Sequence, residues 1–172
     1  MLFSLSPEYF ISLSQHQKSS VTALAVSVVA IVAFAADQYT KRLVQHALLP
    51  NESRVAIPHL LRWTYERNYH GAFGLFGSNA TLLVAMALLV LVLFWISFRE
   101  AAAQSRLVRL AFGLIVGGAI GNIVDRIHFG YVVDFIDFYR IWPNIFNVGD
   151  SCVTIGVVLL LLSSLLASRR RT

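Results

Sequence analysis

The sequence is too hydrophobic and too weakly charged for a soluble domain of its length. Its 172 residues are 57% hydrophobic and 13% charged, whereas a soluble domain carries about 25% charged residues. The net charge of +5 does not indicate nucleic-acid binding, because the basic residues flank apolar segments and form no basic stripe. This placement fits contact with anionic membrane lipids. Composition therefore predicts a single integral membrane domain over residues 1–172.

Four apolar segments predict membrane-spanning helices. A helix needs ~20 apolar residues to cross a hydrocarbon core about 30 Å thick. The segments at about 19–36, 79–98 and 151–168 are uncharged and near that length. The segment at about 107–124 has a shorter uncharged stretch and needs the Arg109 side chain to extend to the interface. We therefore expect an all-α membrane protein with four transmembrane helices.

Two of these segments carry further information. In the first, Ala33, Phe34 and Ala35 look like a secretory cleavage site. No basic run opens the chain, so a retained helix is favoured over a removed signal sequence. The segment at 107–124 contains four glycines, and small residues spaced four apart let helices pack closely in a bilayer. We expect this helix to lie inside the bundle.

The loops at about 37–78 and 125–150 are expected on the extracytoplasmic side. Four spans place both termini on one side, and the two sides carry equal numbers of basic residues. The basic residues near the termini lie in short segments at helix ends, where the positive-inside rule applies best, so both termini are predicted to be cytoplasmic. Stretches such as RVAIP and LLRWTYERN predict a small β-rich element on the membrane surface.

Four of the nine carboxylates fall within 26 residues of one another: Asp125, Asp134, Asp137 and Asp150. Carboxylates at membrane depth are costly, and they are usually paired or functional. Two carboxylates brought together share one proton, so one can activate water while the other protonates a leaving group. This is the chemistry of an aspartyl protease.

The same residues allow plainer interpretations. Asp125 could form an ion pair with Arg126 at a helix end, and Asp137 could face water or pair with Arg140. Asp150 could cap the fourth helix, because a carboxylate suits the unpaired N–H groups there. An ion-conducting or transport role, or a purely structural one, therefore remains open from the residues alone.

No other catalytic set competes with the aspartates. The serines lack a convincing histidine and acid partner, and Cys152 fits a small apolar residue inside a helix. The five histidines show no metal-ligand spacing. Neither a metal nor an organic cofactor is expected.

Four blocks of the sequence resemble the lipoprotein signal peptidase family, also called signal peptidase II. DQYTK resembles the D-x-x-x-K block of the family, with Asp37 and Lys41, and RNYHGAFGLF resembles its N-x-G-A-A-F block. GNIVDRIHFGYVVDF matches its G-N-x-x-D-R…V-D-F block, and FNVGD resembles its F-N-x-A-D block. The blocks occur in the order found in the family and cover most of residues 37–156.

The resemblance implies a bacterial inner-membrane enzyme that cuts diacylglyceryl-modified prolipoproteins just before the lipidated cysteine. It implies inhibition by globomycin, a cyclic peptide antibiotic. Asp134 and Asp150 correspond to the catalytic pair. The residues that would bind substrate or support the pair are Asn68, Asn122, Asp125, Arg126, Asn147, Asp37 and Lys41.

The sequence departs from the family blocks at three positions. His70 and Gly71 replace the usual Gly and Ala of the second block, and Gly149 replaces the usual Ala before the second aspartate. Gly149 keeps that position small. His70 either points to water or alters substrate contacts or the pH profile.

Two rival functions make different predictions. A small proton-coupled transporter or channel using the same carboxylates predicts flux and no processed product. A structural four-helix assembly protein predicts tolerance to substitution at both aspartates.

Overall fold

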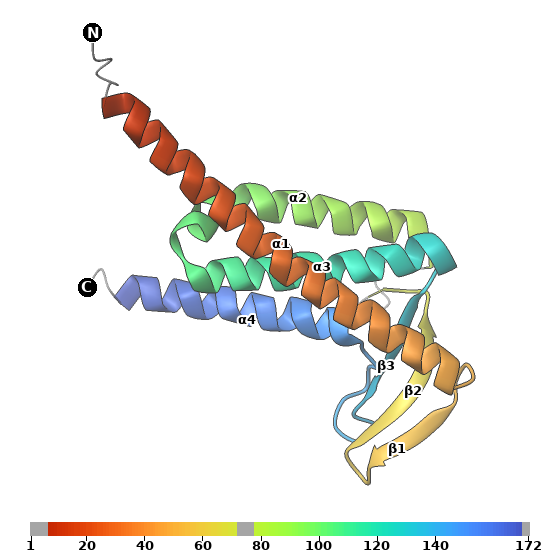
Figure 1. Cartoon of the computed structure of the whole chain (residues 1–172). Coiled ribbons are helices and arrows are strands. Elements are labelled where there is room, and N and C mark those ends of the chain that lie inside the picture. The colour runs from red at the N-terminus through yellow and green to blue at the C-terminus, as the bar shows by residue number, and fades with distance from the viewer. Residues whose placement is uncertain (1–6, 72–77, 170–172) are drawn as a thin grey trace.

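The computed structural model describes residues 7–71 and 78–169 and confirms the predicted fold class. Within these ranges, four helices are long and apolar enough to cross a membrane. Three strands form a small antiparallel sheet at one end of the helices (Figure 1). The elements, in chain order, are α1 (Pro7–Ala47), β1 (Ser53–Ile57), β2 (Leu61–Asn68), α2 (Ala80–Gln104), α3 (Arg106–Phe129), β3 (Val132–Asp137) and α4 (Val148–Arg169).

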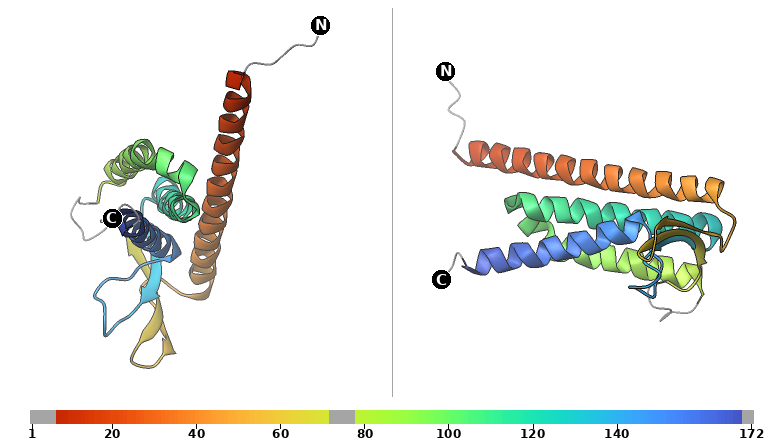
Figure 2. Two further views of the ribbon diagram at one scale, coloured as in Figure 1. Left: turned by 90° about the vertical axis from the view of Figure 1, so that its left-hand side faces the viewer. Right: turned by 90° about the horizontal axis from the view of Figure 1, so that it is seen from below.

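Helix α3 is the central helix of the bundle. It packs against α1, α2 and α4, whereas α2 and α4 do not contact each other within the described ranges. Figure 2 shows this arrangement in its end-on view. A Cβ on Gly117 would lie 2.3 Å from the Ala30 carbonyl of α1, and one on Gly118 would lie 2.3 Å from the Gly149 carbonyl of α4. The glycines therefore permit the close contacts, as the sequence predicted.

Helix α1 continues to Ala47 and does not end near residue 36, where the loop 37–78 was expected to begin. The charges of Asp37 and Lys41 were interpreted as the end of the first membrane-spanning helix. Both side chains are buried and paired with each other four residues apart, so the helix can continue through them. The connection between the first and second helices is correspondingly shorter.

The other helix boundaries also extend beyond the uncharged segments. Helix α2 continues to Gln104, and Ser105 both ends it and caps α3, with its side chain accepting from the backbone N–H of Val108. Helix α3 continues past residue 124 to Phe129. It ends at Gly130, whose φ of 79° is a left-handed conformation that glycine adopts readily.

The sheet confirms the predicted β-rich element and has the strand order β1-β2-β3. All residues of β1 are exposed, whereas β3 is almost entirely buried between β2 and the helices. The register between β2 and β3 places Asn68 opposite Val132 and Glu66 opposite Asp134. A small core of Leu48, Tyr65 and Val133 joins the sheet to the end of α1.

Candidate active site

Asp134 and Asp150 lie at the end of the bundle that carries the sheet. Asp134 is in the middle of β3, and Asp150 is in the first turn of α4. Asp134 has only 1% of its surface exposed. Strand β3 pairs with β2, and α4 is the next element after β3. The chain therefore brings both side chains to the same end of the bundle.

Asn147 joins the two carboxylates. Its side-chain amide donates to Asp134 Oδ1 at 2.6 Å, and its backbone N–H donates to Asp150 Oδ2 at 3.3 Å. Its side-chain oxygen accepts from the backbone N–H of Asp150 at 2.8 Å. This reciprocal pair is a capping box, in which Asn147 caps α4. Asp150 is therefore not the capping residue itself, which corrects one interpretation of the sequence.

Two further asparagines bind the remaining carboxylate oxygens. The Asn68 amide donates to Asp134 Oδ2 at 2.9 Å, and the Asn122 amide donates to Asp150 Oδ1 at 2.8 Å. The oxygen of Asn68 accepts from the backbone N–H groups of His70 and Gly71, which fixes the orientation of its amide. Each aspartate oxygen thus has a neutral donor, and no Lys or Arg forms an ion pair with either carboxylate among the described residues.

The electrostatic environment of Asp134 favours its protonated form. Burial and, after it, the neighbouring charge of Asp150 raise the pKa of Asp134 to about 7, although hydrogen bonds from Asn68 and Asn147 act in the opposite direction. A carboxyl group with a pKa near neutrality can hold and release a proton at the pH of a cell.

Asp37, Lys41 and Asp125 form a separate, charge-compensated cluster. The Lys41 ammonium lies 2.7 Å from Asp37 Oδ2 and 2.9 Å from Asp125 Oδ2, and it donates to Asn122 Oδ1 at 2.8 Å. All three donors of the ammonium are thereby satisfied. Lys41 thus holds Asn122, which in turn contacts Asp150.

Asp125 pairs with Lys41 and not with its neighbour Arg126, contrary to the simplest interpretation of the sequence. Its second role is structural, because Asp125 Oδ2 accepts the backbone N–H of Val133 at 3.1 Å. That hydrogen bond fixes β3 against α3, one residue before Asp134. Asp125 therefore positions the strand that carries Asp134.

Asp37 fixes the start of α4 in a similar way. Its Oδ1 accepts the backbone N–H of Gly149 at 2.7 Å, one residue before Asp150. A Cβ at position 149 would lie 2.8 Å from the Gly118 carbonyl and 3.1 Å from Asp37 Oδ1. Gly149 therefore permits a close approach of α3 and α4 that alanine would oppose, which accounts physically for this departure from the family block.

Arg126 lies close enough to Asp150 and Asp134 for their charges to interact. Its terminal nitrogen makes a long hydrogen bond of 3.4 Å to the Asn122 carbonyl. Its Nε is buried and has no hydrogen-bond partner in the described part of the chain. A buried, unsatisfied donor is costly, and in a native protein it often marks a place where a ligand binds.

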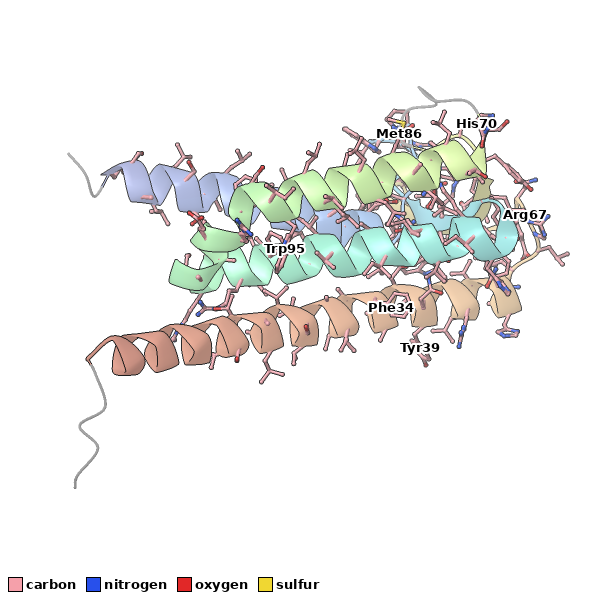
Figure 3. All side chains as sticks on the ribbon, turned by 90° about the horizontal axis from the view of Figure 1, so that it is seen from above. Phe34, Tyr39, Arg67, His70, Met86 and Trp95 are labelled. Carbon is pink, nitrogen blue, oxygen red and sulfur yellow. The ribbon has the colours of Figure 1, made fainter. Side chains whose placement is uncertain are left out.

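Two residues singled out from the sequence lie apart from the aspartate pair. Asp137 forms an ion pair of 2.5 Å with Arg62 and accepts from Thr64, so it neither faces water nor pairs with Arg140. His70 is exposed at the end of the bundle that carries the sheet, near the start of α2 (Figure 3). The rest of its block, residues 72–77, lies outside the described residues.

One site residue was missed from the sequence. Gln38 donates to Asp125 Oδ1 at 3.0 Å and to the Gly121 carbonyl at 3.3 Å, so it links α1 to α3 beside Lys41. Its position directly after Asp37 was the available signal. Among the described residues, no group of three or more His, Cys, Asp or Glu side chains could hold a metal ion.

The fold and the buried aspartate pair define a polytopic membrane protein with a site suited to acid–base chemistry. Residues 29–166 match the family model of signal peptidase (SPase) II, which covers most of the chain. The chain belongs to this family, and membership of the signal peptidase II family identifies it as a protease.

Relatives and solved structures agree with this assignment. The lipoprotein signal peptidase of Moorella thermoacetica is 38% identical over 76% of this chain and 86% of its own length. That of Symbiobacterium thermophilum is 40% identical over 84% of this chain and 97% of its own length. Two bacterial membrane enzyme structures determined by the in meso method superpose with TM-scores of 0.78 and 0.73 at 30% and 32% identity. They cover 86% and 81% of this chain, and 91% and 92% of their own chains. None of these comparisons supports the alternative function of a proton-coupled transporter or channel.

Proposed function

We propose that this protein is an aspartyl endopeptidase that removes the signal peptide from diacylglyceryl-modified prolipoproteins, with Asp134 and Asp150 as its catalytic pair. The observation that carries the proposal is the bridge formed by Asn147. It joins two buried carboxylates, neither of which forms an ion pair with a Lys or Arg among the described residues. Such a pair retains one proton and can act as acid and base together.

The reaction follows from that shared proton. The ionised carboxylate removes a proton from a bound water, and the resulting oxygen attacks the scissile carbonyl carbon. The protonated carboxyl group donates its proton to the carbonyl oxygen, giving a neutral tetrahedral diol. When the C–N bond breaks, the pair donates its proton to the leaving nitrogen, and one hydroxyl of the diol returns a proton to the pair as its C=O bond forms. The products are a carboxylic acid and an amine. The pair ends with one proton, as it began, and no cofactor takes part.

Arg126 and Asn68 are the residues best placed to hold the substrate peptide. The unpartnered, buried Nε of Arg126 is a donor that a substrate carbonyl can satisfy. Asn68 ends β2, and its amide already contacts Asp134, so a peptide beside the strand would lie within reach of the pair. Asn122 and Asn147 hold the pair directly through their hydrogen bonds, and the charged residues Asp125, Asp37 and Lys41 support it indirectly.

The substrate's signal helix enters from the bilayer between α2 and α4. These two helices do not contact each other in the described ranges, so no pairing between them has to break for a substrate helix to enter there. The diacylglyceryl chains can then remain in the membrane while the peptide reaches Asp150 at the start of α4. Helix α1 begins and α4 ends at the end of the bundle opposite the sheet (Figure 1). We place both termini in the cytoplasm, because the short basic segments at those helix ends favour that side, and the pair then faces the extracytoplasmic side of the inner membrane.

The test is a gel-shift assay that follows cleavage of a diacylglyceryl-modified prolipoprotein by the purified protein. Wild type should release the signal peptide and be blocked by globomycin. Asp134→Asn and Asp150→Asn should be inactive while they remain folded. Glu100→Gln, which changes an exposed carboxylate on α2, is the matched control and should cleave normally. Turnover by either aspartate variant would remove that residue from the catalytic pair, and proton flux without cleavage by folded wild type would favour the transporter.

A further inference from the structure

A cavity lies beside Lys41, between the ends of α1 and α3 near the sheet. Its volume is about 250 Å³, smaller than the 300–1,000 Å³ typical of drug-sized ligands. It has room for a headgroup-sized molecule. Its lining residues are Gln38, Lys41, Arg42, Gln45, Val124, Asp125, His128 and Phe129.

The polar groups on the inner wall of this cavity already have hydrogen-bond partners. Lys41 donates to its three acceptors, and Gln38 is committed to Asp125 and Gly121. A ligand entering the cavity therefore meets a closed hydrogen-bond network at its inner end. Its recognition depends on the groups at the mouth.

The mouth carries unneutralised positive charge. Arg42 is exposed and makes no ion pair or hydrogen bond within the described part of the chain, unlike Arg54 and Arg62, which pair with carboxylates. His128, in the last turn of α3, lines the same cavity. A guanidinium and an imidazole that line one cavity suit a phosphate group, because the planar fork of arginine binds two phosphate oxygens at once.

The surroundings of the mouth are apolar and face the bilayer. Val124 and Phe129 line the cavity, and Leu43 and Ile127 beside it are half or more exposed. Tyr39 is 64% exposed and projects from α1 away from the other helices (Figure 3). An exposed tyrosine near the end of a membrane-spanning helix is typical of the headgroup level. A phosphate bound here would therefore carry acyl chains that cover these apolar side chains.

We propose that the cavity between α1 and α3 binds the phosphate of one anionic phospholipid, with Arg42 and His128 holding the headgroup and the apolar side chains of the two helices holding its acyl chains. The site is separate from the aspartate pair, because the Lys41 network lies between them. It does not depend on the proposed reaction.

The experiment is native mass spectrometry of the full-length protein, extracted from vesicles that contain equal amounts of phosphatidylglycerol and phosphatidylcholine with the same acyl chains. Wild type should retain one phosphatidylglycerol in preference to phosphatidylcholine. Arg42→Gln should lower that retention about five-fold, the factor that one basic side chain near an anionic membrane surface typically contributes. Arg140→Gln, which removes an equally exposed charge from the loop before α4, is the matched control and should leave retention unchanged.

A second arm separates a lipid from a soluble anion. Inorganic phosphate is titrated into wild type in lipid-free detergent, and binding is followed by calorimetry. No binding at millimolar phosphate, together with Arg42-dependent retention of phosphatidylglycerol, supports a lipid site. Arg42-dependent binding of inorganic phosphate at micromolar concentration would overturn it in favour of a soluble anion site. Equal retention of phosphatidylglycerol by wild type and Arg42→Gln would overturn the site itself.

Discussion

The protein contains two groups of buried aspartates that differ in their direct partners: a lysine ammonium forms ion pairs with the first group, whereas neutral donors bind the second. Asp37 and Asp125 share the Lys41 ammonium at 2.7 and 2.9 Å. Asp134 and Asp150 have only amide and backbone donors. An ion pair with a cation favours the charged form of a carboxylate, which then serves as a fixed acceptor, whereas two carboxylates held near each other by neutral donors favour a shared proton. The first group therefore acts as scaffold, and the second is suited to chemistry.

The two groups are also connected. Lys41 holds Asn122, and Asn122 contacts Asp150. Asp37 fixes Gly149, and Asp125 fixes Val133, so each scaffold aspartate binds the residue that precedes one member of the pair. The comparison leads to separate expectations: changes in the scaffold should lower stability first, and changes in the pair should lower activity first.

The largest effect on stability is expected for Lys41→Met. Removing the ammonium leaves Asp37 and Asp125 buried without their counter-charge, and breaking a buried ion pair in this way typically costs about 3–5 kcal/mol. The free energy of unfolding in detergent should fall by that order. Adding Asp37→Asn and Asp125→Asn to the same chain should recover part of the loss. If the triple variant is no more stable than Lys41→Met, the ionic account of this cluster is wrong.

Asn147→Ala should lower both activity and stability. The variant loses the hydrogen bond to Asp134 and the cap of α4, and a misplacement of about 1 Å at a catalytic group can reduce the rate about 100-fold. Loss of the cap alone costs ~1 kcal/mol. Ser105→Ala removes the N-cap of α3 at the end of the bundle opposite the sheet, and is the matched control. Equal cleavage rates for the two variants would mean that Asn147 only caps its helix.

The raised pKa of Asp134 predicts a pH dependence of stability. Its folded pKa of about 7 lies above the ordinary value of 3.8 that it regains on unfolding. Between these values the folded protein holds a proton that the unfolded chain has lost, so this group makes the protein less stable as pH rises from about 4 to 7. Unfolding temperatures measured across this range should show that slope in wild type. Asp134→Asn should flatten it, and an unchanged slope would assign the effect to another group.

Gly149→Ala should have the smallest effect of this series. The added Cβ meets the Gly118 carbonyl at 2.8 Å, which opposes the ~1 kcal/mol that alanine gains over glycine in a helix. Overpacking of this kind costs about 1–3 kcal/mol, so a net loss of about 1 kcal/mol is expected. Gly156→Ala creates a similar overlap with the Ala111 carbonyl, further along α4. Both should lower the unfolding temperature, but only Gly149→Ala should change the cleavage rate.

Much of the fold could be predicted from the sequence, because the uncharged segments report directly on the thickness of a membrane. The ends of the helices could not be predicted from these segments. The charges of Asp37 and Lys41 led us to end the first segment there, yet both residues lie inside α1. They pair with each other, and their further partners come from α4 and α3. In the same way, Asp125 stands beside Arg126 in the sequence but pairs with Lys41, which is 84 positions earlier in the chain.

The candidate site shows the same limit. The residues of the pair were visible as carboxylates near apolar sequence, and the family resemblance supplied their partners. The roles of Asn147 as cap and bridge, and of Gln38 as a link between α1 and α3, depend on contacts between distant segments. No local pattern encodes those contacts.

The most direct test of the distinction between the two aspartate groups is the cleavage rate per folded molecule for Asp134→Asn and Asp37→Asn, measured on the same diacylglyceryl-modified prolipoprotein. We predict that Asp134→Asn folds with an unfolding temperature near that of wild type at neutral pH and shows no cleavage. Asp37→Asn should unfold at a lower temperature and retain measurable turnover in its folded fraction. Turnover by Asp134→Asn, or a stable but inactive Asp37→Asn, would contradict the division into a reactive pair and a scaffold.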